Sequence, residues 1–92
     1  MNETAFRHLP EQKRFEWPMD GGDVWARYSR DGDTLAVLHV EADPALRGTG
    51  AAGRFMQALV EWARAEGVKL RPVCSYAAVW LQRSKASHDV LA

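Results

Sequence analysis

Three side chains able to move protons or carry an acyl group stand out: His39, Glu41 and Cys74. His39 and Glu41 are two residues apart, so in a strand they share one face. Because an imidazole titrates near neutral pH, His39 is a candidate general base for an amine or for the Cys74 thiol. The alternatives are a satisfied polar pair at a strand end for His39 and Glu41, and an inert, buried residue for Cys74.

The stretch from Gly48 to Gly53 carries a second kind of chemistry, because it is rich in glycine and precedes a predicted helix. Glycine lets the backbone approach a ligand without a Cβ clash. The first turn of a helix offers free N–H groups and the positive end of the helix dipole. The sequence therefore predicts a phosphate or pyrophosphate site here. It matches neither the P-loop pattern nor the complete dinucleotide fingerprint.

Three segments before this loop predict an antiparallel meander. In residues 14–19 and 23–30, side chains of two kinds alternate along the chain, as in a strand with two different faces. Pro18 favours an edge position for the first of these strands. Asp31-Gly32 predicts a tight hairpin. Residues 34–41 are apolar at most positions, which predicts a central strand covered on both faces.

After the loop, the period changes to that of a helix over residues 51–66, with Gly67 as a left-handed C-cap. A short strand is expected over residues 68–74, then a second helix over 76–83 with Ser75 as its N-cap. The tail from residue 84 either frays or docks loosely. The order predicts an α+β domain: an antiparallel meander joined to a right-handed β-α-β crossover, with a mixed sheet and two helices.

The composition narrows the function classes. The chain has 92 residues, which predicts a single domain over 1–92 with its core at about 14–83. Twelve basic and twelve acidic residues cancel, which argues against a nucleic-acid partner bound through phosphate neutralisation. A single cysteine and no apolar leader within residues 1–10 predict a cytoplasmic protein with no membrane segment.

Beyond these general features, Arg47, Gly50 and Ala52 fit the pattern Arg/Gln-x-x-Gly-x-Gly/Ala, which resembles the acetyl-CoA pyrophosphate loop of the GNAT (N-acetyltransferase) superfamily. Together with Pro72-x-Cys74-x-Tyr76 and Trp80-Leu81-x-Arg83, the loop makes the chain similar to the short YjdJ-type GNAT-like subfamily over residues 14–83. Ser84-Lys85-Ala86-Ser87 departs from the His-Pro-Glu-Tyr-like run usual there.

The resemblance implies a GNAT-like domain of two or three layers with a splayed sheet. It implies acetyl-CoA or coenzyme A as cosubstrate, with pantetheine along residues 40–42 and pyrophosphate on the amides of residues 48–53. The implied cofactor site is Val40, Glu41, Ala42, Arg47, Gly48, Thr49, Gly50, Ala51, Ala52, Gly53, Cys74 and Tyr76, and the catalytic candidates are Cys74, His39 and Glu41. No metal site is expected.

The function implied is transfer of an acetyl group from acetyl-CoA to an unidentified amine. The alternatives are a non-catalytic acyl-CoA-binding or sensing module, a carrier acylated on Cys74, and an interaction domain that uses the loop only structurally. In the first case Cys74 would lie beside the thioester, and Tyr76 would either protonate the leaving thiolate or simply pack. We expect a monomer or a weak homodimer, since a meander leaves an edge that could pair with a second copy.

Overall fold

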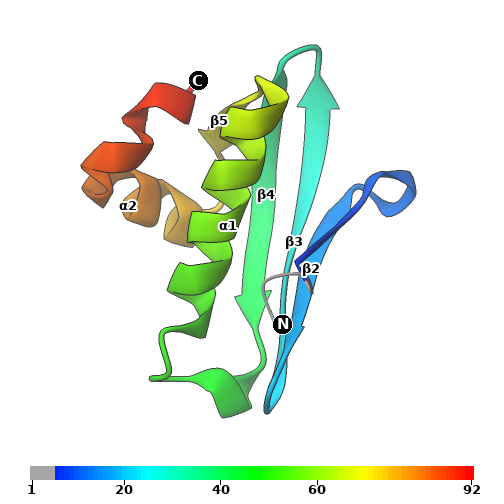
Figure 1. The fold of residues 1–92 in the computed structure, drawn as a ribbon, viewed down its shortest axis with the longest axis vertical. Coiled ribbons are helices and arrows are strands. Elements are labelled where there is room, and N and C mark those ends of the chain that lie inside the picture. Colours follow the sequence, from blue (N-terminus) through cyan, green and yellow to red (C-terminus); the bar gives the residue numbers. More distant parts are fainter. Residues whose placement is uncertain (1–5) are drawn as a thin grey trace.

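The computed structural model describes residues 6–92, in which a five-stranded sheet supports two α-helices (Figure 1). The strands, in their order across the sheet, are β1 (Arg7–Leu9), β2 (Arg14–Met19), β3 (Gly22–Asp31), β4 (Thr34–Ala42) and β5 (Lys69–Pro72). The helices are α1 (Ala51–Glu66) and α2 (Ser75–Arg83), with short 3-10 turns η2 (Pro10–Gln12), η3 (Pro44–Leu46) and η4 (Lys85–Val90). β1 to β4 are antiparallel, and β4 and β5 are parallel neighbours joined through α1. The predicted meander and crossover are confirmed.

One face of the sheet carries the core. Along β3, Val24, Ala26 and Tyr28 are buried while Arg27 and Ser29 are exposed, which is the alternation of an antiparallel sheet with one solvated face. Both helices contribute to the same hydrophobic cluster as these buried residues. The domain therefore has two layers, and in Figure 1 α1 lies across the front of β4.

The prediction that β4 is covered on both faces holds only for the first half of the strand. Leu35, Ala36 and Val37 are all buried, at 0%, 5% and 1% exposed, whereas Leu38 is 38% exposed and Glu41 is exposed. The reason is a β-bulge: Arg27 pairs with His39 and Tyr28 with Val37, so Leu38 is an extra residue without a partner on β3.

The bulge resets which side chains of β4 face the helices. Beyond it, Val40 and Ala42 pair with the buried Ala26 and Val24, and so share the core face with them. His39 and Glu41 consequently point to the opposite, solvated face. Past the bulge, the apolar run that looks two-sided in the sequence is thus one-sided in the fold.

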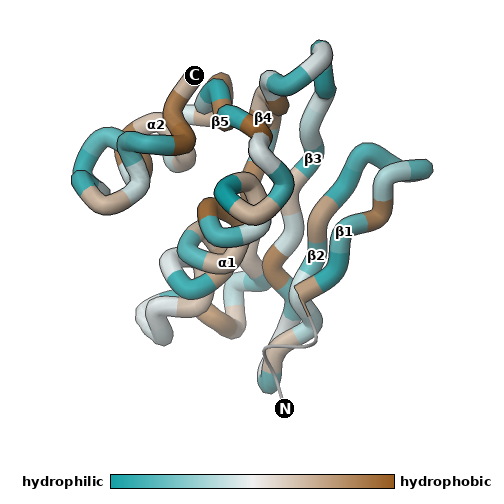
Figure 2. Tube along the Cα trace, turned by 45° about the horizontal axis from the view of Figure 1, so that its top comes forward, coloured by the Kyte–Doolittle hydropathy of each residue, from teal (hydrophilic) through white to brown (hydrophobic). Residues whose placement is uncertain are grey.

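α1 has the predicted bounds, residues 51–66, and its apolar stripe is buried. Figure 2 shows hydrophilic and hydrophobic residues alternating along it. Gly67 adopts φ 72° and donates its N–H to the carbonyls of Ala63 and Arg64, so the predicted left-handed C-cap is confirmed. The buried residues are Ala51, Phe55, Met56, Leu59, Val60 and Ala63.

Three predictions about element boundaries need correction. The strand at residues 14–19 is the second, because β1 precedes it and pairs with residues 14–16. The strand expected over 68–74 ends at Pro72. Ser75 is not the N-cap of α2: Cys74 is, since its N–H still bonds Val37 O while its carbonyl already accepts the N–H of Ala78.

The C-terminal tail is docked along β5. Leu91 forms a parallel bridge with Leu70, and the N–H of Ala92 donates to Leu70 O at 2.8 Å. Val90 is buried, and the Arg64 guanidinium holds both carboxylate oxygens of Asp89 at 2.8 and 2.9 Å. Of the two alternatives for this segment, the structure shows docking.

Candidate functional site

An opening forms where β4 and β5 separate. Their pairing covers residues 34–37 and 69–72 and then stops. The N–H groups of Val73 and Cys74 both reach Val37 O at 3.0 Å, which turns the chain away from β4. From His39 to Ala42, β4 pairs with β3 alone, so its other edge offers main-chain donors and acceptors that no strand among residues 6–92 takes up. The opening begins at the bulge.

The loop after β4 is held in shape by short-range hydrogen bonds. The Asp43 carboxylate accepts the N–H of Ala45 at 3.1 Å and starts η3, whose Leu46 is buried. The Thr49 hydroxyl donates to Leu46 O at 2.6 Å and accepts the N–H of Ala51 at 3.2 Å. An Asp directly before a Pro is a recognisable start of a helical turn, although the sequence interpretation did not use Asp43.

Four amide groups of this loop and of the first turn of α1 remain free. Within the described chain, no hydrogen bond uses the N–H of Gly48, Gly50, Ala52 or Gly53. These four residues line one depression of about 240 Å³, together with the flanking loop and Tyr76. A concave group of unsatisfied donors thus lies at the helix N-terminus where the sequence predicts an anion site. Its lining is Ala42, Asp43, Pro44, Leu46, Arg47, Gly48, Gly50, Ala51, Ala52, Gly53 and Tyr76.

Two of the glycines are required by backbone conformation. Gly48 and Gly50 have φ of 81° and 80°, in the left-handed region that most side chains avoid. At Gly53 a Cβ would lie 3.6 Å from the indole nitrogen of Trp80, an ordinary van der Waals distance, so the space there does not demand glycine. The short separation shows that the first turn of α1 lies beside α2, which no local pattern in the sequence signals.

Thr49 and Arg54 differ from the other loop residues in position. Both line a separate hollow beside Trp17 rather than the depression. The Arg54 guanidinium donates to Thr49 O at 3.1 Å and so braces the loop from behind. Thr49, predicted as a cofactor contact, therefore lies on the side of the loop that faces away from the depression.

Cys74 and Tyr76 lie together where the opening meets α2. Cys74 is a free, half-buried thiol, and its residue packs against the core. Tyr76 lines the depression, and its pKa is raised mainly by burial and further by the neighbouring Cys74. The phenol therefore keeps its proton at neutral pH and can donate it.

His39 and Glu41 form the predicted pair, with Nε2 and Oε1 2.9 Å apart, on the solvated face of β4. Their side chains are 46% and 55% exposed, and the His39 ring lies 5.2 Å from that of Trp25. No hydrogen bond links either of them to Cys74 within residues 6–92. The structure thus places the pair at the same opening but on the face of the sheet away from α1.

No group of three or more His, Cys, Asp or Glu side chains in residues 6–92 is arranged to bind a metal ion. The same region contains no helix that is both long and apolar enough to cross a membrane.

Comparison with a solved structure supports the architecture. A GCN5-like protein from Staphylococcus aureus, determined in solution by NMR, matches with a TM-score of 0.73 and 22% sequence identity. The match covers 100% of this chain and 91% of that one. At this identity the likeness concerns the fold, and it confirms the predicted GNAT-like α+β arrangement.

Sequence comparison identifies the family. No curated protein matches the chain. The family model described as GCN5-related N-acetyl-transferase matches residues 14–90, which include the strands β2 to β5, both α-helices and the loop. Membership in the YjdJ-type subfamily stays a prediction. Because the match spans most of the sequence, the chain belongs to the family of GCN5-related N-acetyltransferases.

Proposed function

We propose that this protein binds acetyl-CoA at the glycine loop and transfers its acetyl group to an amine. The observation that carries the proposal is the set of four free amide N–H groups around one depression, at Gly48, Gly50, Ala52 and Gly53. Convergent backbone donors at a helix N-terminus suit the oxygens of a pyrophosphate. Arg47 lies on the same rim and adds positive charge. Family membership supports the general activity, N-acetyl transfer.

The free edge of β4 supports a place for the rest of the cofactor. Pantetheine contains two amide groups, and an extended chain with amides can add to an open strand edge. Residues 38–42 offer such an edge directly next to the loop. An arm bound there would bring the thioester toward Cys74 and Tyr76.

The chemistry then needs positioning and two proton transfers. The amine nitrogen attacks the thioester carbon, a C–N bond forms, and the C–S bond breaks as the coenzyme A thiolate leaves. Tyr76 gives its proton to that thiolate, and His39, held by Glu41, takes the proton that the amine loses. Because the pair lies on the solvated face of the sheet, we propose that the amine approaches from that face.

Cys74 permits a second route that starts from the same complex. Its sulfur would attack the thioester carbon, forming a new thioester on the protein and releasing coenzyme A. An acetyl adduct that depends on Cys74, without transfer to an amine, would describe the acylated carrier. Binding without either product would describe a sensing module. We place all three activities in the cytoplasm, which a lone reduced cysteine favours.

Isothermal titration with acetyl-CoA tests the loop directly. We expect Gly50→Asp to weaken binding by more than about tenfold, since a carboxylate would repel the pyrophosphate. Gly50→Asn is the matched control, because Asn and Asp both tolerate the left-handed region while only Asp is charged. It should retain most of the affinity, with circular dichroism showing both variants folded. Equal affinity of the wild type and Gly50→Asp would remove the loop from the site.

A further inference from the structure

The face of the sheet away from the helices has an exposed arginine beside the proposed base. Arg27 of β3 pairs directly with His39 of β4, on the same side of the sheet. Cross-strand partners of this kind have their Cβ atoms about 4.5–5.5 Å apart. Because Arg27 is exposed, its guanidinium lies in the solvent next to the point where an amine would reach His39.

The charge of Arg27 has no counterpart in the described chain. Arg27 forms no ion pair with any residue from 6 to 92. Two carboxylates lie diagonal to it in the strand register, and both have other partners. Glu16 bonds two arginines at 2.7 and 3.2 Å, and Glu41 bonds His39 at 2.9 Å. Among residues 6–92, then, nothing neutralises this guanidinium.

The neighbour of Arg27 on its other side is also an arginine. In the register of β2 and β3, Arg14 lies directly opposite Arg27. Like charges in such a pair destabilise a sheet. Folding therefore does not explain why residue 27 is an arginine, whereas binding does, because a guanidinium takes up both oxygens of a carboxylate in its planar fork.

An aromatic surface adjoins these charges. The guanidinium of Arg14 lies 4.4 Å from the ring centroid of the half-buried Trp25, and the His39 ring lies 5.2 Å from that of Trp25. Tryptophan and arginine are enriched among the residues that carry most of the binding energy at protein interfaces. The surface around His39 thus has the composition of a protein-recognition site.

The open shape of this face also favours a polypeptide. Small-molecule sites are usually concave and cover most of their ligand. Here both α-helices pack on the other face of the sheet, so neither of them roofs the surface around His39 (Figure 1). An extended polypeptide can lie across such a surface and place every second side chain on it.

The spacing of such a polypeptide matches the two residues. Side chains two positions apart in an extended chain are roughly 6.6 Å apart and point to the same side. This is close to the separation of a cross-strand pair such as Arg27 and His39. A lysine whose amine meets His39 therefore brings the residue two positions away to Arg27.

We propose that the acceptor is a lysine side chain of a polypeptide with an acidic residue two positions away, whose carboxylate Arg27 binds. The inference rests on the proposed function, since it names the acceptor class of the same reaction. It makes Arg27 the residue that selects the acceptor, next to the base that takes its proton.

Acetylation of matched peptides, followed by mass spectrometry, tests this assignment. The peptides share one central lysine and carry Glu or Gln at both positions two residues from it. The wild type should show a kcat/KM about tenfold higher for the Glu peptide, because one charge-assisted bond is lost with Gln. Arg27→Gln should abolish this preference and leave kcat/KM for the Gln peptide unchanged. Arg27→Glu should instead prefer a peptide with Arg at those positions.

The controls separate recognition from folding. Arg30 is exposed on the same strand but pairs with the buried Leu35, so it lies on the other face, and Arg30→Gln should keep the preference. A peptide with Glu directly beside the lysine should react like the Gln peptide. Arg27→Gln should melt no lower than the wild type, since it removes the repulsion from Arg14.

Titration of the same proteins with acetyl-CoA distinguishes the two ways to fail. Wild-type protein that binds acetyl-CoA but acetylates the Glu and Gln peptides equally, or acetylates neither, would overturn this inference while the loop site stands. Loss of the preference in Arg30→Gln as well as in Arg27→Gln would do the same. No binding of acetyl-CoA by folded wild-type protein would overturn the proposed function and this inference with it.

Discussion

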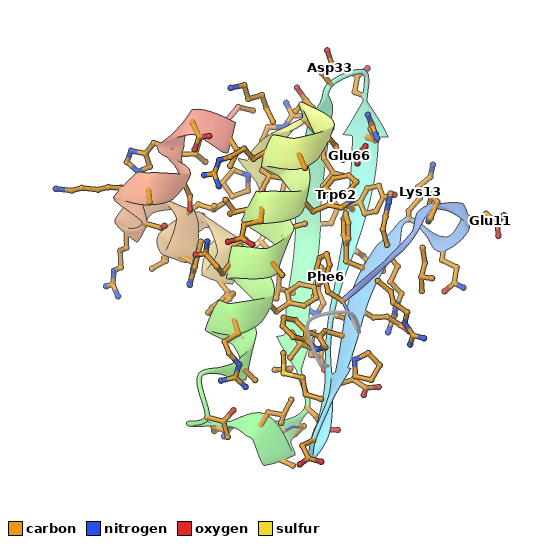
Figure 3. The ribbon with its side chains drawn as sticks, viewed as in Figure 1. Phe6, Glu11, Lys13, Asp33, Trp62 and Glu66 are labelled. Atoms are coloured by element: carbon orange, nitrogen blue, oxygen red, sulfur yellow. The ribbon has the colours of Figure 1, made fainter. Side chains whose placement is uncertain are left out.

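His8 carries its imidazole into an aromatic cluster between β1, β2 and α1. Its ring lies 4.5 Å from Phe15 and 4.7 Å from Trp62, and Nε2 is 2.5 Å from the Tyr28 hydroxyl. Burial lowers the pKa of His8, nearby Arg30 lowers it further, and Glu66 partly opposes them. Figure 3 shows Phe6 and Trp62 in the region that α1 shares with these strands. The folded protein therefore favours a neutral ring.

A pH-dependent stability follows from this position. Below the unfolded-state pKa of about 6.5, the unfolded chain takes up a proton at residue 8 that the folded chain resists. The stabilisation is complete above that pH and declines as the pH falls toward the lowered folded-state pKa. Urea unfolding at pH 7.5 and 5.5 should show the wild type losing more stability than His8→Phe, which keeps an aromatic ring but does not titrate. The same loss of unfolding free energy in both proteins would mean that protonation of His8 does not cause the pH dependence.

At the scale of elements, the hairpin between β2 and β3 supports the ligand loop. A Cβ on Gly22 would lie 2.5 Å from Cβ of Asp43, the residue that starts η3. The N–H of Asp43 also bonds Asp23 O at 2.9 Å. The position of the glycine loop thus depends on a glycine more than twenty residues earlier in the chain.

Gly22→Ala should consequently affect binding as well as stability. The clash moves Asp43 and with it the loop, so we expect several-fold weaker coenzyme A binding and a lower melting temperature. Gly32→Ala is the comparison, because Gly32 has φ 61° but nothing within 4 Å of an added Cβ. It should lower the melting temperature and leave the affinity unchanged, as measured by calorimetry. A binding defect shared by both variants would assign the effect to general destabilisation.

The sequence predicts an element well when the residues that determine it are close together in the chain. The helical period over the sixteen residues of α1 and the Gly67 cap are local signals, and the structure confirms both predictions. β1 has three residues, too few to show a period, and it is a strand because it pairs with β2 and because Arg7 bonds Glu16 at 2.7 Å. The bulge at Leu38 is likewise invisible, since one extra apolar residue in an apolar run leaves no local signal.

The candidate site likewise has parts that the sequence predicts and parts that it does not. The glycines of the loop and the nearby Cys74 and Tyr76 carry recognisable spacing, so the sequence indicates them. The proximity of Trp80 to Gly53 depends on segments that meet only in the folded chain. The bond from Arg54 to Thr49 spans only five residues, but it follows no pattern that the sequence interpretation used.

At the scale of the whole molecule, the docked tail completes the edge of the sheet at β5. Val90 is 3% exposed, and its neighbour Asp89 is held by Arg64. We expect Val90→Asp to destabilise the protein by about 2–4 kcal/mol, since it buries a charge and loses apolar contacts. Val73→Asp makes the same substitution at a residue that is 58% exposed and should cost less than about 1 kcal/mol. If denaturant unfolding shows that Val90→Asp loses as little free energy of unfolding as Val73→Asp, the tail contributes little to stability.

The bulge at Leu38 has a consequence for how the gene could change. Removing this one residue would leave Val37 and His39 adjacent, opposite Tyr28 and Arg27, which are already adjacent, so every other pair of β3 and β4 would keep its partner and its face. An in-frame loss of the Leu38 codon is therefore a deletion that the fold could absorb by straightening the strand. Removing Val40 instead would shift Glu41 and Ala42 to the wrong sides. Selection against losing Leu38 would then act through the opening that begins there rather than through folding.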